Sequence, residues 1–106
     1  MDELEQFDKI IQGFQRVIKR IESLDVQNKS TKESLNLQKE FYEHLIRAII
    51  ASKLLLEKLT PEVVKKRFGK DKIQKDLEIF AKSLSEAERG IDTWEGIINI
   101  NSKTQH

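Results

Sequence analysis

One apolar pattern constrains what this chain can fold into. Between residues 73 and 98, apolar side chains recur at steps of three and four residues without a break. This spacing places side chains on one face of an α-helix. No stretch alternates with the two-residue period of a half-buried strand, so the chain is predicted to be all-α. The pattern consists of Ile73, Leu77, Phe80, Leu84, Ala87, Ile91, Trp94 and Ile98.

Two earlier segments predict further long helices. Segment 3–24 has a broad apolar face, and Gly13 inside it either marks a close helix crossing or has no packing role. Ser30 followed by Glu33 is typical of a capping box and predicts a second helix over about 31–59. This second helix is apolar on most of its circumference around residues 45–56. Its main stripe is Phe41, Leu45, Ala48, Ser52, Leu55 and Leu59, and its flanking row is Leu35, Tyr42, Ile49 and Leu56.

A short helix is predicted between the second and the last long helix. Pro61 suits the first position of a helix, and Gly69 is expected to close it as a left-handed cap. Asp71 then caps the last helix. Short connections make the long helices antiparallel neighbours. The predicted fold is an antiparallel bundle of three long helices plus one short connecting helix, with a single domain over 1–100 and a polar, disordered tail over 101–106.

Composition excludes several classes of protein. The chain has 106 residues, 38% of them apolar and 35% charged, with a net charge of +1 and no cysteine. A disulfide scaffold and a thiolate zinc site are therefore excluded, and the apolar content is too high for a disordered chain. The longest apolar-rich run, 45–56, is interrupted by Arg47 and Lys53 and is too short to span a bilayer. The acidic N-terminus is unlike a signal peptide, and we expect a cytoplasmic protein.

The apolar surplus of the second helix favours a protein–protein interaction module, without enzymatic activity. One helix of a three-helix bundle needs about half of its circumference apolar, and this helix offers more. Either the short helix folds over the surplus, or a second subunit or another protein binds it. In the latter case we expect Ile46, Ile50 and Leu54 to be the partner contacts and a homodimer to form. Small regulators, inhibitors, immunity-type proteins and assembly adaptors all fit this class.

A basic run provides the alternative function. Residues 61–76 hold six cations and three acids, whereas residues 77–106 hold three cations and five acids. Phosphate groups favour such a run, which therefore indicates a nucleic-acid or phosphate-binding bundle. The simpler explanation, which we favour, is a solvated corner of the fold where the lysines keep a helix junction soluble. The cations are Lys65, Lys66, Arg67, Lys70, Lys72 and Lys75.

His44 is the one histidine within the predicted helices. The segment His44-Leu45-Ile46-Arg47-Ala48 resembles the His-x-x-Lys-Gly element of histidine phosphotransfer domains, which implies a helical bundle that carries phosphate on His44. It departs from that element at Arg47 and Ala48. Glu40 and His44 share a helix face but form only part of a metal site. No metal, cofactor or small-molecule substrate is expected.

Overall fold

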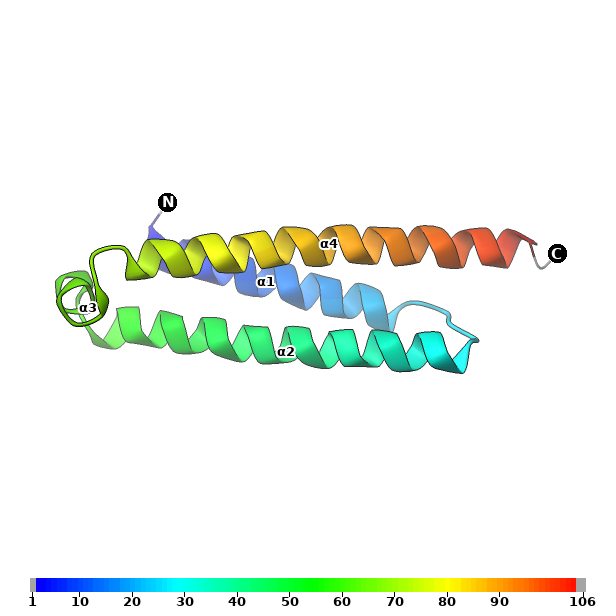
Figure 1. Ribbon diagram of the computed structural model, residues 1–106, viewed down its shortest axis with the longest axis horizontal. Coiled ribbons are helices and arrows are strands. Elements are labelled where there is room, and N and C mark those ends of the chain that lie inside the picture. The colour runs from blue at the N-terminus through cyan, green and yellow to red at the C-terminus, as the bar shows by residue number, and fades with distance from the viewer. Residues whose placement is uncertain (1, 105–106) are drawn as a thin grey trace.

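The computed structural model describes the backbone of residues 2–104 and the side chains of residues 2–100. Within this range four helices form an elongated bundle: α1 (Glu3–Glu22), α2 (Lys29–Lys58), α3 (Pro61–Phe68) and α4 (Lys72–Thr104). No strand occurs among the described residues. The long helices run up, down and up, so α2 is antiparallel to both α1 and α4 (Figure 1). The predicted fold class is confirmed. The bundle measures 61 × 22 × 17 Å.

Side chains cap the first turns of three helices. Asp2 accepts a hydrogen bond from the Glu5 N–H at 2.8 Å, and Thr60 accepts one from the Val63 N–H at 3.3 Å. The capping box predicted at Ser30 was wrong. Asn28 caps α2 instead, by accepting from the Thr31 N–H at 3.0 Å. Asparagine caps as well as serine does, so α2 begins two residues earlier than expected.

The turn between α3 and α4 depends on Gly69. Its φ of 106° favours glycine, as predicted, but its ψ of 159° is extended and differs from a left-handed cap. Glycine alone adopts this region readily. The last helix then begins at Lys72, directly after Asp71. It continues as a helix through Thr104, so the backbone described beyond residue 100 prolongs α4. The rest of the predicted 101–106 tail lies outside the described residues.

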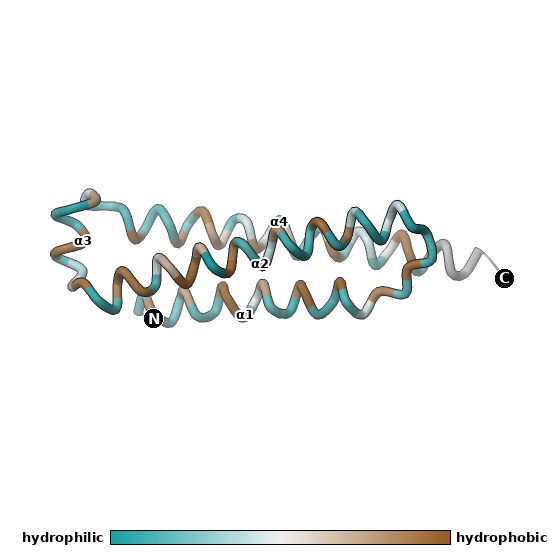
Figure 2. The backbone as a smooth tube through the Cα atoms, turned by 90° about the horizontal axis from the view of Figure 1, so that it is seen from below, coloured by the Kyte–Doolittle hydropathy of each residue, from teal (hydrophilic) through white to brown (hydrophobic). Residues whose placement is uncertain are grey.

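The core is centred on α1, which packs against both α2 and α4. Phe7, Phe14 and Val17 of α1 are almost completely buried, and the Phe14 ring lies 5.8 Å from that of Tyr42 on α2. Figure 2 shows the apolar positions of the long helices gathered between them. The contribution of α2 comes from the flanking row, because its buried residues are Leu35, Ile49 and Leu56. The predicted stripe of α4 supplies the buried residues Leu77, Ala87 and Ile91.

Gly13 marks a close crossing of α1 and α4. A β-carbon at Gly13 would lie 2.4 Å from Cδ2 of Leu84. The absence of a side chain on α1 therefore lets Leu84 of α4 pack directly against the helix backbone. Of the two explanations left open for this glycine, the close crossing is the correct one.

The loop between α1 and α2 closes one end of the core. Val26, within the segment that interrupts the apolar pattern, is buried. A pocket of about 140 Å³ opens beside it, between Ile21 of α1 and Leu35 of α2. At the opposite end α3 lies across the bundle, with Val64 buried. Because α3 contacts α2 and α4 only at this end, it leaves the middle of α2 uncovered.

Candidate functional site

Ion pairs show which side of α2 faces α1. Lys53 of α2 binds Asp8 of α1 at 2.7 Å, and Lys39 of α2 lies 3.8 Å from Glu22 of α1. The hydrogen bond with Asp8 raises the pKa of Lys53, although desolvation acts in the opposite direction. These two lysines and the buried flanking row occupy adjacent sides of α2. The main stripe is therefore turned away from α1.

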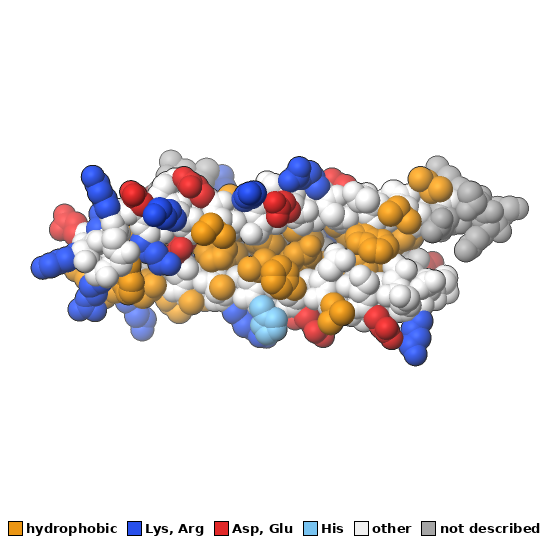
Figure 3. Space-filling view, in the orientation of Figure 1, with side chains coloured by type: hydrophobic (Ala, Val, Ile, Leu, Met, Phe, Trp, Pro, Cys, Tyr) orange, Lys and Arg blue, Asp and Glu red, His pale blue; other side chains and the backbone are white. Residues whose placement is uncertain are grey.

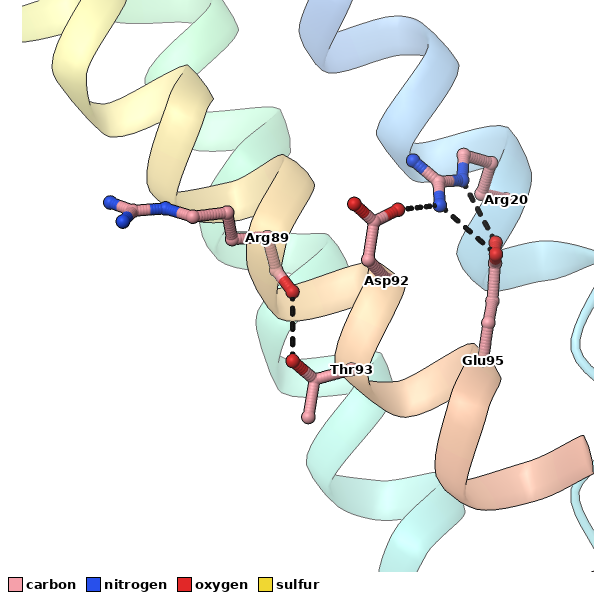
Figure 4. A network of polar contacts seen from close by, with 5 residues as sticks. All are labelled: Arg20, Arg89, Asp92, Thr93 and Glu95. Carbon is pink, nitrogen blue, oxygen red and sulfur yellow. Dashed lines mark hydrogen bonds and ion pairs between the residues drawn. The ribbon is translucent and has the colours of Figure 1, made fainter. Parts of the chain in front are cut away.

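A bidentate contact between Arg20 of α1 and Glu95 of α4 shows which side of α4 faces α1. The Nε and Nη2 atoms of Arg20 donate to the two carboxylate oxygens of Glu95 at 2.8 and 3.0 Å, and Nη2 also binds Asp92 (Figure 4). The hydrogen bond from Arg20 lowers the pKa of Glu95, and both acids raise the pKa of Arg20. All three groups remain partly exposed. Together with Leu84, Glu95 and Asp92 define the side of α4 that faces α1.

An apolar groove runs between α2 and α4 on the face opposite α1. These two helices contact each other at few points, in contrast to their extensive packing against α1. Figure 3 shows apolar side chains in a continuous band between them. At 100° per residue, the groove side is set by the main stripe of α2 and by the α4 positions turned away from α1. The α2–α4 groove is lined by Phe41, Leu45, Ala48, Ser52 and Leu55 of α2 and by Phe80, Ser83, Gly90 and Trp94 of α4.

Side chains in the middle of the groove are small or half-exposed. Phe41 is exposed over 58% of its surface, and Ala48, about two helical turns further on, is also exposed. Trp94 packs partly against the core. Nothing lies within 4 Å of a β-carbon built on Gly90. The groove thus combines accessible apolar surface with space for another side chain.

The three residues predicted as partner contacts lie on another side of α2. Ile46 is partly buried and packs against the core. Ile50 and Leu54 are exposed over 42% and 44% of their surfaces and stand one turn apart, beyond Lys53. They form a smaller apolar patch that is separate from the groove. The sequence contained the signal for the groove in the main stripe of α2, but the partner contacts were predicted beside that stripe.

The predicted basic run lies at the α3 end of the bundle. Lys65, Lys66, Arg67 and Lys70 are exposed, and no ion pair involves them among the described side chains. Lys72 is engaged by Asp76 at 3.0 Å. The last predicted cation, Lys75, is exposed on the first turns of α4. The structure therefore brings most of the run together as one accessible positive surface.

His44 is exposed on α2, where its Nδ1 atom lies 3.3 Å from Nη1 of Arg47. Among the side chains of residues 2–100, no polar or charged residue is buried. In the same range, no group of three or more His, Asp or Glu side chains is placed to hold a metal ion. The described surface offers exposed apolar area and exposed charge, and both are suited to binding another molecule.

The geometry defines a slender all-helical bundle with an open apolar face. No described helix combines the length and apolar character needed to cross a membrane. Comparison with protein families, with curated proteins and with solved structures finds no match to this chain.

Proposed function

We propose that this chain is a non-enzymatic protein–protein interaction module that acts by burying the α2–α4 groove against an α-helical surface of a partner. The observation that carries this proposal is the orientation of α2. The helix turns its flanking row to the core and leaves Phe41 and Ala48 of the main apolar stripe exposed, with the rest of that stripe partly buried. An exposed apolar groove between helices is a common docking site for an amphipathic helix. A regulator, inhibitor, immunity-type protein or adaptor would act in this way, by occlusion or scaffolding.

Cytoplasmic location is part of the same proposal, in keeping with the lack of cysteine. The smaller patch of Ile50 and Leu54 is a secondary contact in this proposal, and Ile46 supports it from beneath.

The test compares two alanine positions that receive the same substitution. Ala48→Glu places a charge in the groove, whereas Ala81→Glu places one on an exposed site of α4 that lies away from it. Glutamate is a good helix former, so both variants keep their helices. We expect a fluorescent dye that binds apolar surface to bind the dilute wild-type chain and Ala81→Glu equally, and Ala48→Glu much less. Proteins captured by the immobilised chain should show the same dependence. Equal behaviour of all three chains would contradict the proposal.

A second candidate function rests on the four exposed and unpaired cations at the α3 end. Lys65, Lys66, Arg67 and Lys70 form a surface suited to the phosphates of a nucleic acid. We expect an affinity for nucleic acid that falls steeply with salt, measured by fluorescence anisotropy. Replacement of Lys66, Arg67 and Lys70 by glutamate should abolish it without unfolding the chain. Ala48→Glu leaves this affinity unchanged if the two surfaces act independently.

A further inference from the structure

We propose that the partner in the α2–α4 groove is a second copy of this chain, packed face to face with its ends swapped. This inference rests on the proposed function and specifies the partner. A two-fold axis across the long direction of the bundle would place α2 against α2 and α4 against α4 of the other copy. The four helices would then form a new bundle, with each α1 on its outer side.

Surface area supports a second copy. The chain exposes 7553 Å², whereas a compact folded monomer of 12.4 kDa exposes about 6,100 Å². The excess is about 1,400 Å², and a stable dimer of standard size buries about 800 Å² on each partner. The radius of gyration, 17.2 Å, also exceeds the roughly 13 Å of a compact domain of this length. The elongated chain therefore has more surface to spare than one side of such an interface needs, and a face-to-face dimer would thicken the bundle along its shortest direction.

The groove is suited to pairing with itself. Its two walls, α2 with 30 residues and α4 with 33, are nearly equal in length. Two small residues, Ala48 and Gly90, lie in the middle of the face. Small residues allow two helix layers to approach closely, since the distance between helix axes depends on the side chains at the contact. The Phe41 side chain, whose ring lies 6.0 Å from that of Tyr42, is exposed over 58% of its surface and is available to fill the opposite groove.

Charge decides which of the two face-to-face arrangements forms. With the ends matched, two basic α3 ends, each with six cations and three acids in residues 61–76, would meet and repel each other. With the ends swapped, each basic end approaches the C-terminal half of the other α4. Residues 88–104 there hold three acids and two cations, and two of the acids are paired with Arg20. The swapped arrangement therefore keeps the two basic runs apart and avoids the repulsion of the matched one.

The experiment measures the absolute mass of the full chain by light scattering over a dilution series. We expect wild type to approach twice 12.4 kDa at high concentration and to dissociate on dilution. Ala48→Glu should weaken the dimer roughly a hundredfold or more, because each dimer contains the charge twice. Ala81→Glu should associate like wild type. Phe41→Glu provides a second variant, and circular dichroism checks that each variant is helical.

Orientation is tested with a spin label at a single introduced cysteine, Lys66→Cys, since the chain has no other cysteine. Swapped ends predict a distance approaching the 61 Å length of the bundle, and a distance below half of that length would overturn this arrangement. A wild-type chain that is monomeric at every concentration overturns the second copy as partner. If dye binding and capture still depended on Ala48 in that case, the proposed function would stand. An unaltered dimer of Ala48→Glu would show that another surface pairs.

Discussion

The helices α1 and α2 belong to the same bundle but use their apolar residues differently. Seven of the 20 residues of α1 are buried, compared with three of the 30 residues of α2. The shorter helix is the centre of the core, because α2 and α4 both pack on it and hardly on each other. The longer helix carries more apolar residues than one neighbour can cover. Its surplus therefore lies on the open face, which is the feature that points to a function.

The largest expected difference in the free energy of unfolding is between alanine variants of two phenylalanines, one on each of these helices. Phe14 of α1 is completely buried, and Phe14→Ala should lower the free energy of unfolding by about 3–5 kcal/mol through lost contacts and a cavity. Phe41→Ala on α2 should change it by less than about 0.5 kcal/mol in the dilute monomer. Urea unfolding at low concentration measures both values. Equal losses would show that the groove side of α2 is part of the monomer core.

A smaller effect distinguishes Gly13, which lies in the α1–α4 contact, from Gly96, which lies on the exposed surface of α4. Gly13→Leu places a side chain where Leu84 already lies and should cost about 1–3 kcal/mol. Gly96→Ala meets no atom within 4 Å and should stabilise the chain by up to about 1 kcal/mol, through helix propensity alone. Thermal unfolding with matched protein concentrations measures the pair. A stable Gly13→Leu variant would contradict the close crossing.

The smallest expected effect on stability concerns the ion pair between Arg20 of α1 and Glu95 of α4, whose contribution depends on pH. Arg20 lowers the pKa of Glu95 below its ordinary value of 4.5 in the folded chain. The pair therefore stabilises the fold above that value, and the stabilisation is lost as the pH falls through the folded-state pKa. Because both groups are partly exposed, Glu95→Gln should cost less than about 1 kcal/mol at neutral pH. The difference from wild type should shrink under acid, and a constant difference would speak against this ion pair.

Much of the architecture was predictable from local chemistry. The unbroken stripe of α4, Pro61 at the start of α3 and the need for glycine at position 69 all act within one or two helical turns, and each was identified. The cap of α2 was misplaced because Asn28 and Ser30 are similarly good caps, and the pattern around Glu33 favoured the wrong one. Val26 was missed because a single apolar residue in a polar loop has no periodicity.

The candidate site was predicted less well, for a reason specific to α2. A helix that is apolar on most of its circumference has several faces that could be buried, and its own sequence does not rank them. The rotation of α2 is set by contacts with α1, such as Lys53 with Asp8 and Tyr42 with Phe14. The main stripe therefore lines the groove, and Ile46 packs against the edge of the core.

By itself the sequence determined an all-helical chain, three long amphipathic helices, a short connector and a basic run, because these features depend on spacing and composition along one segment. Only the tertiary structure decided that α1 is the central helix and which stripe of α2 is left open. Helix rotation is a property of pairs of helices: complementary charges and ring contacts that lie tens of residues apart in the chain decide which face each helix presents.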